Sequence, residues 1–370
     1  MKKQNIIYAL ILLTTLFCAC EKKPQITMPQ AVAAGDEQAV EYYLKHGGNV
    51  NQYDDKGRPL IILAAIQGSP AITEMLIKNG ADVNAVDTSE EIFSLNSTAE
   101  GIPTEGAGRP LSSQGSTALI WAVISGNTDA AKLLIQNGAQ NADKAIMFAI
   151  SEANTNVIKK LIESNIININ EENQYGITPL ILASMNGRTN VAKLLIENGA
   201  QVDAVNKFGA SALIYATKAG HLGVVKLLVK NKANTGIKTV KDHLTPLMSA
   251  AESGYADIVK YLAEETSADV NARDIENWTA LIWASINKGH PDVVKVLLEH
   301  GADVNAVNND GAGALMLASK VGDVDIVKLL LASKANVNLV SKEGKTALMS
   351  AKKEGHGEIV KLLEQAGARK

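Results

Sequence analysis

Few side chains in this chain have both the type and the spacing that chemistry requires. Its 370 residues include six histidines and two cysteines. They form no H-E-x-x-H, no metal-binding arrangement of paired cysteines and no G-x-S-x-G. The run G-K-T at residues 344–346 lacks the glycine that a phosphate-binding loop needs five places earlier, where Leu339 stands. Asp and Asn are frequent, but they recur at regular intervals, as turn-forming residues do. We predict no enzyme activity, no metal and no cofactor.

The two cysteines lie close to the start of the chain and indicate a different chemistry. Lys2 and Lys3 precede an apolar run over residues 6–17, and Cys18 and Cys20 follow it. This order of charge, apolar run and small residue is typical of a secretory signal. The run is also shorter than the roughly 20 residues that span a bilayer.

The end of this segment, L-F-C-A-C, resembles the lipobox of bacterial lipoproteins, although Phe17 stands where that motif usually has Leu. The resemblance implies a signal peptide over residues 1–19, lipidation of Cys20 and a spacer over residues 20–28. The expected location is the bacterial cell envelope, facing the periplasm, at the outer membrane rather than the inner. An ordinary secreted or N-anchored form is the alternative.

The composition favours a folded protein without affinity for nucleic acid. The chain is 46% hydrophobic and 20% charged, with a formal net charge of −3. It therefore lacks the low hydrophobicity of a disordered chain and the basic footprint of a nucleic-acid binder.

The chain repeats itself. The hexapeptide T-A-L-I-W-A occurs at residues 117–122 and again at 279–284. In the same frame, a glycine follows each apolar helical run at steps of 33 to 35 residues, except for one step of 58 and one of 28. The glycines are Gly35, Gly68, Gly126, Gly187, Gly220, Gly254, Gly289, Gly322 and Gly355, with Asn154 in the same frame.

A period of 33 residues with T-P-L or T-A-L openings is similar to the ankyrin repeat. From about Pro29 to its end, the chain resembles ten such repeats. The resemblance implies an all-α solenoid of helix-turn-helix units joined by turn fingers, occupying residues 29–370. Thr178 and Pro179 suit the first turn of a helix, because a hydroxyl can cap its free N–H groups and proline needs no donor there.

Three departures from the ankyrin pattern are evident. Ile or Met replaces the His that usually follows T-P-L, so we expect apolar contacts where that His would bond. The step of 28 predicts a truncated turn before the repeat at residues 143–173. The step of 58 predicts a projecting loop over residues 88–113, rich in Gly and Pro. This loop is either surface decoration or a second contact element.

Ankyrin repeats generally bind proteins through their finger tips and inner helices. The corresponding tip positions here hold large apolar residues, which we predict to be the protein-binding site: Tyr175, Ile177, Phe208, Leu244 and Trp278. Trp121 and Trp283 fall on inner helices and are predicted to be core. The expected function is a monomeric, membrane-tethered scaffold that captures one protein partner, sequestering or inhibiting a periplasmic enzyme or toxin. A structural scaffold that assembles an envelope complex without altering any activity is the alternative.

Overall fold

A computed structural model describes residues 23–89, 115–140, 142–151, 154–163, 168–286 and 288–369. Within these ranges the chain forms 20 helices and no strand, as the repeat pattern predicts. The expected signal peptide, Cys20 and most of the expected loop over residues 88–113 lie outside the described residues. None of the described helices has the length and apolarity needed to cross a bilayer.

The helices fall into two compact units, Met1–Ile167 and Asn168–Lys370. The first contains α2 (Met28–Ala34), α3 (Glu37–Lys45), α4 (Leu60–Gln67), α5 (Pro70–Lys78), α6 (Ala118–Ile124), α7 (Thr128–Gln136), α8 (Ala142–Ser151) and α9 (Thr155–Glu163). The second contains α10 (Pro179–Met185), α11 (Thr189–Glu197), α12 (Ala212–Lys218), α13 (Leu222–Lys230), α14 (Pro246–Ser253), α15 (Ala256–Glu265), α16 (Ala280–Ile286), α17 (Pro291–Glu299), α18 (Ala314–Val321), α19 (Val324–Ala332), α20 (Ala347–Glu354) and α21 (Gly357–Gln365).

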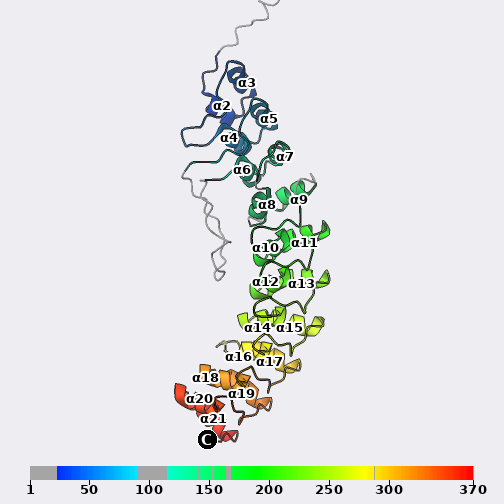
Figure 1. The fold of residues 1–370 in the computed structure, drawn as a ribbon, viewed down its shortest axis with the longest axis vertical. Helices are drawn as coiled ribbons and strands as arrows, with labels where there is room; N and C mark the ends of the chain where they lie inside the picture. Colours follow the sequence, from blue (N-terminus) through cyan, green and yellow to red (C-terminus); the bar gives the residue numbers. More distant parts are fainter. Residues whose placement is uncertain are drawn as a thin grey trace, which may run out of the picture. The chain divides into compact units, whose positions relative to one another are not determined.

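Within each unit, consecutive helices form antiparallel pairs that stack one on the next (Figure 1). The even-numbered inner helices of the second unit contact one another in series from α10 to α20, and the odd-numbered outer helices do the same from α11 to α21. This is the arrangement of a helical-repeat solenoid, in which each pair completes its core against its neighbours.

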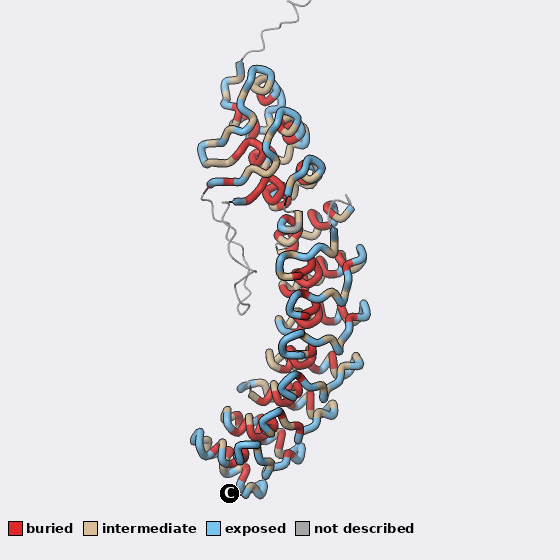
Figure 2. The backbone as a smooth tube through the Cα atoms, in the orientation of Figure 1, coloured by how far each residue is buried: buried red, intermediate tan, exposed pale blue. Residues whose placement is uncertain are grey.

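The core runs along the inner helices of each unit (Figure 2). On successive inner helices of the second unit, Ala183, Ala216, Ala250, Ala284 and Ala318 are each 0% exposed. A small side chain at this position allows neighbouring helices to approach closely. Leu195, Leu228, Leu262, Leu297 and Leu330 occupy the buried stripe of the outer helices.

The helix ends follow the sequence signals. The Oγ1 of Thr178 accepts a hydrogen bond from the N–H of Ile181 at 3.3 Å, and Thr245 caps α14 in the same way. Gly254 ends α14 with φ of +82°, and the His290 ring of the next repeat occupies the space that a Cβ there would need. A side chain at position 254 would therefore meet both backbone strain and a clash.

The short step produces the truncated turn that the sequence predicts, because only five residues separate α7 from α8. At the long step, the described ends of the insertion pair with each other, and Val86 and Thr117 form the bridge that closes the base of a finger. The N–H of Asp87 donates to the carbonyl of Ser116 at 2.9 Å, and the N–H of Gly115 donates to the carbonyl of Asp87 at 2.8 Å. The two ends of the insertion are thus joined at the base of this finger.

Polar bonds between repeats are present, although the sequence suggested apolar contacts instead. The His221 ring lies 3.0 Å from the carbonyl of Met185, and His356 makes the same contact with Lys320 at 3.1 Å. Asn residues in the turns after the outer helices add a second set, described below. The missing His is replaced by polar groups elsewhere in the repeat.

Candidate protein-binding edge

The second unit presents six turn fingers, at residues 173–177, 206–210, 239–244, 274–278, 308–312 and 341–345. In four of them, one Asx side chain fixes the turn by accepting two backbone N–H groups. Asp274, for example, accepts from Glu276 at 2.9 Å and from Trp278 at 2.8 Å. Asn173, Asn206 and Asn308 do the same in their own fingers.

The fingers are also joined to one another by backbone hydrogen bonds. The N–H of Val240 donates to the carbonyl of Phe208 at 2.9 Å, and the N–H of Ile275 donates to the carbonyl of Asp242 at 3.2 Å. The remaining neighbours are joined through Lys207 to Tyr175, Asn309 to Glu276 and Lys342 to Asp310. The tips therefore form one continuous edge, held in place before any partner arrives.

Of the five tip residues predicted from sequence, Phe208 alone is exposed, at 61%. Tyr175, Leu244 and Trp278 are half-buried. Ile177 is only 9% exposed, so its assignment to a contact surface is corrected here. Ile177, Leu244 and Trp278 each directly precede the Thr that caps an inner helix, which places them at the base of a finger.

Two exposed apolar residues were missed by the sequence reasoning. Val240 is 68% exposed and Ile275 is 56% exposed, and both directly follow the residue that begins their finger. Counting from the first residue of each finger finds them, but that residue is identified only by the backbone pairing. Phe208, Val240 and Ile275 lie on three successive fingers, and we refer to these three residues as the tip patch.

Trp278 and Trp283 form a tilted pair, with ring centroids 4.7 Å apart. The indole N–H of Trp283 donates to Asp274 Oδ2 at 3.0 Å, so one carboxylate holds both the finger and the inner-helix indole. Trp283 is half-buried, which corrects its assignment to the core. Trp121, by contrast, is 5% exposed and donates to Asp87 at 3.1 Å.

On α12, the position that corresponds to Trp283 holds Tyr215. The Tyr215 hydroxyl accepts a hydrogen bond from Asn206 at 2.8 Å. Burial raises the pKa of Tyr215 above its ordinary value, and the Asn206 bond offsets only part of that rise. Tyr215 therefore stays neutral at physiological pH and supports the finger that carries Phe208.

The edge carries mixed charge. Lys207, Lys241, Asp242 and Glu276 are exposed beside the tip patch. The described residues contain no group of three or more His, Cys, Asp and Glu side chains that could hold a metal ion. The arrangement is suited to contact with another macromolecule through apolar tips and a charged rim.

Stacked helix pairs and a continuous finger edge define a class, that of helical-repeat scaffolds that bind other proteins. Within that class, the chain belongs to the ankyrin-repeat family. The family model, described as ankyrin repeats (3 copies), matches residues 3–87, 96–173, 146–239, 232–308 and 303–370.

Similar proteins share short stretches of the chain. Palmitoyltransferase akr1 of Schizosaccharomyces pombe is 50% identical over 64 residues, which is 17% of this chain and 10% of that protein. Human BCL-6 corepressor-like protein 1 is 46% identical over 67 residues, 18% of this chain and 4% of that protein. Ankyrin repeat domain-containing protein 49 of Bos taurus is 44% identical over 70 residues, 19% of this chain and 29% of that protein. The chain thus spans less than a third of the length of each of these relatives.

Proposed function

We propose that the second unit holds a protein partner through the tip patch. The observation that carries this proposal is the exposure of Phe208, Val240 and Ile275 on three adjacent fingers. Single exposed apolar residues are ordinary, but a row of them on one edge is less so. An aromatic residue with aliphatic neighbours is a common anchor in protein interfaces.

The rigidity of the fingers supports the same proposal. Each finger of the tip patch is joined to the next by a backbone hydrogen bond, and two of the three begin with an Asx cap. Ordering a loop on binding costs free energy, so fingers that are ordered beforehand lower this cost.

We further propose that the chain acts as a monomer tethered to the bacterial envelope by lipid on Cys20, facing the periplasm at the outer membrane rather than the inner. The support is the charge and apolar order of residues 2–20. A lipobox implies acylation at more than one point, and two or more acyl chains give stable anchoring. In that place the captured partner would be an enzyme or toxin of the envelope that the scaffold sequesters or inhibits.

The runner-up is a structural scaffold that assembles an envelope complex. Activity of the bound partner distinguishes the two functions. A partner recovered with the chain from detergent-solubilised membranes is assayed with and without an excess of the purified chain. Loss of its activity favours sequestration, and unchanged activity favours the structural role.

A further inference from the structure

In the turn that leads to each inner helix of the second unit except α14, one residue reaches across to the next repeat. Asn271 is an example: its Oδ1 accepts from the N–H of Asp303 at 2.7 Å, and its Nδ2 donates to the carbonyl of Gly301 at 3.0 Å. We call this residue the bridging residue. It is Asn170, Asp203, Asn271, Asn305 or Asn338 in five of the repeats.

The remaining repeat has Gly236 at this position, so no side chain bridges it to the next repeat. The N–H of Asp269 corresponds to the N–H that a bridging residue binds elsewhere. Within the described residues, this N–H donates to no side chain or carbonyl. A donor that is satisfied at every other junction of the unit is therefore open at this one.

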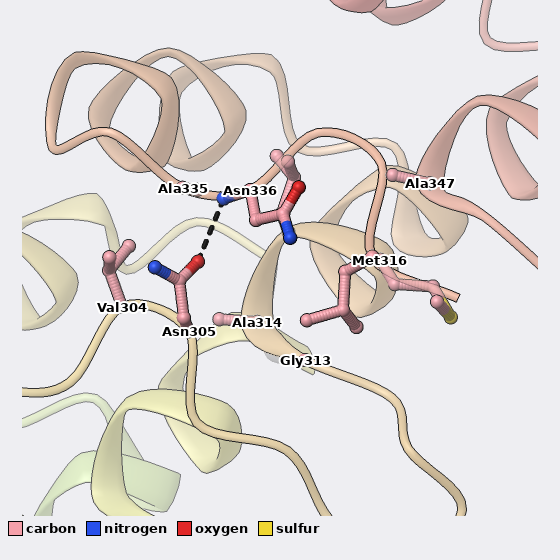
Figure 3. A pocket seen from close by; sticks show the side chains of 10 residues that line it. Val304, Asn305, Gly313, Ala314, Met316, Ala335, Asn336 and Ala347 are labelled. Atoms are coloured by element: carbon pink, nitrogen blue, oxygen red, sulfur yellow. Dashed lines mark hydrogen bonds between the residues drawn. The ribbon is translucent and has the colours of Figure 1, made fainter. Parts of the chain in front are cut away.

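A cavity of about 430 Å³ lies at this junction, lined by Gly236, Leu247 and Asp269 among others. The equivalent place two repeats later, lined by Asn305, Leu315 and Asn336, has a cavity of only about 10 Å³. There the Asn305 side chain accepts from the N–H of Asn336 at 2.7 Å and fills the space (Figure 3). The bridging side chain thus occupies at this site the donor and part of the space that stay open at Gly236.

The charges at the open cavity differ from those at its filled counterpart. Lys238 and Arg273 line the open cavity, at positions that Val307 and Val340 occupy two repeats later. The Nζ of Lys238 donates to the carbonyl of Arg273 at 3.0 Å, and Arg273 donates to the carbonyl of Val307 at 3.0 Å. These bonds use one of the three donors of the ammonium and leave further donors on the guanidinium. Asp269 supplies the single opposing charge of the lining.

We propose that the cavity at Gly236 binds a carboxylate, from an Asp or Glu side chain of the protein partner. The carboxylate accepts from the N–H of Asp269 and faces Lys238 and Arg273. The preceding repeat shows that a carboxylate suits this position, because Asp203 accepts from the N–H of Asn234 at 2.8 Å. The proposal rests on the proposed function and sharpens it: Lys238 lies two residues before Val240, so the partner carries an acidic residue beside its apolar contact.

The test uses a free ligand, so it does not depend on the partner. The full chain, labelled with ¹⁵N and held in detergent micelles, is titrated with N-acetyl-glutamate α-amide, and separately with the matching glutamine compound. We expect saturable shifts of the Gly236 and Asp269 amide signals with the glutamate compound, and binding at least tenfold weaker with the glutamine compound. Equal binding of the two, or no shift at Asp269, would overturn the proposal.

Two variants sharpen the result. Gly236→Asn restores the bridging side chain, and a Cβ at Gly236 has room, with its nearest neighbour 3.5 Å away. We expect this variant to lose the response at Asp269. Asn305→Gly removes the bridging side chain two repeats later, where Val307 and Val340 stand in place of Lys238 and Arg273, and we expect no saturable shift of the Asn336 amide there. A retained response at Asp269 in Gly236→Asn would contradict the role of the open cavity. Binding of the glutamate compound at Asn336 in Asn305→Gly, as strong as at Asp269 in the wild type, would contradict the role of the two cations.

The outcome is separable from that of the tip patch. Binding of the glutamate compound with no effect of the tip patch on partner affinity would leave the cavity and remove the proposed function. If the glutamate compound does not bind but tip-patch substitutions weaken the partner's affinity, the cavity proposal fails and the proposed function stands.

Discussion

At the residue scale, the shape of the binding edge depends on a few polar side chains that each serve several groups. Asp274 accepts two backbone N–H groups with one oxygen and the Trp283 indole with the other. It is 8% exposed, so its loss leaves buried or half-buried donors without an acceptor. Such a loss costs about 1–3 kcal/mol for one fully buried donor and less for a donor that water can reach, as it can at these part-buried groups.

We therefore predict that Asp274→Ala lowers the free energy of unfolding by roughly 1–3 kcal/mol. Chemical denaturation followed by tryptophan fluorescence measures this, since Trp278 and Trp283 report on the same site. Asp242→Ala is the control, because the Asp242 carboxylate is exposed and has no hydrogen bond among the described residues. Equal effects of the two substitutions would show that the Asp274 bonds do not support the edge.

Asp54, in the first unit, gives a prediction about pH. Burial raises its pKa, but the hydrogen bonds and charge of Arg58 outweigh this and bring the pKa below its ordinary value. A lowered folded pKa stabilises the fold above the unfolded value of about 3.9, and this contribution is lost as the pH falls through the folded pKa.

The stability gap between the wild type and Arg58→Gln should consequently be constant near neutral pH and should narrow below about pH 4. Denaturation curves from pH 7 down to pH 3 measure it. A gap that stays the same at pH 3 would mean that the ion pair does not cause the difference.

Sequence reasoning at this scale found Phe208 and missed Val240 and Ile275. The fingers were aligned on their glycine, but the finger at 239–244 has one extra residue, since Thr239 pairs with Leu244 where Asn206 pairs with Ala210. His243 and Asn277 take the left-handed conformation at the glycine position, with φ of +58° and +60°. The exposed positions follow from the backbone pairing, which the sequence alone does not show.

At the element scale, the helices were predictable because their signals are local. Threonine caps, small inner-helix residues and helix-ending glycines recur in frame, and each has a physical role in one repeat. The bridging residues were not predicted, because their partners lie about one repeat away and an Asn in a turn equally suits the turn itself. The division into two units likewise has no local signal.

The inserted segment provides an element-scale prediction. Its ends are joined through Asp87, Gly115 and Ser116, and Asp87 also accepts from Trp121. Replacing residues 90–114 by a two-residue Asn-Gly turn should therefore leave the helix content and melting temperature nearly unchanged. Circular dichroism on heating measures both. A cooperative loss of structure would show that the segment is part of the core of the first unit.

At the scale of the whole molecule, the proposed anchor determines where the edge can act. We predict that Cys20→Ser abolishes lipidation and leaves an unprocessed precursor that migrates more slowly on a gel, whereas Cys18→Ser changes little. Metabolic labelling with a fatty-acid analogue detects the lipid directly. Equal processing and labelling of the wild type and the Cys20 variant would exclude the lipoprotein proposal without affecting the binding edge.

The central claim is that the tip patch holds a protein partner, and the affinity for that partner tests it most directly. The partner recovered with the wild-type chain is purified, and its Kd is measured for the wild type and for Phe208→Ala, Val240→Ala and Ile275→Ala. Val340→Ala is the matched control, since Val340 is 57% exposed at the base of another finger.

We expect Phe208→Ala to weaken binding by roughly 1–3 kcal/mol, and the triple variant to weaken it further. The control should bind with the Kd of the wild type. Every variant should have a free energy of unfolding within about 0.5 kcal/mol of the wild-type value, because the changed residues are exposed. A triple variant that folds normally and binds the partner with unchanged Kd would contradict the claim.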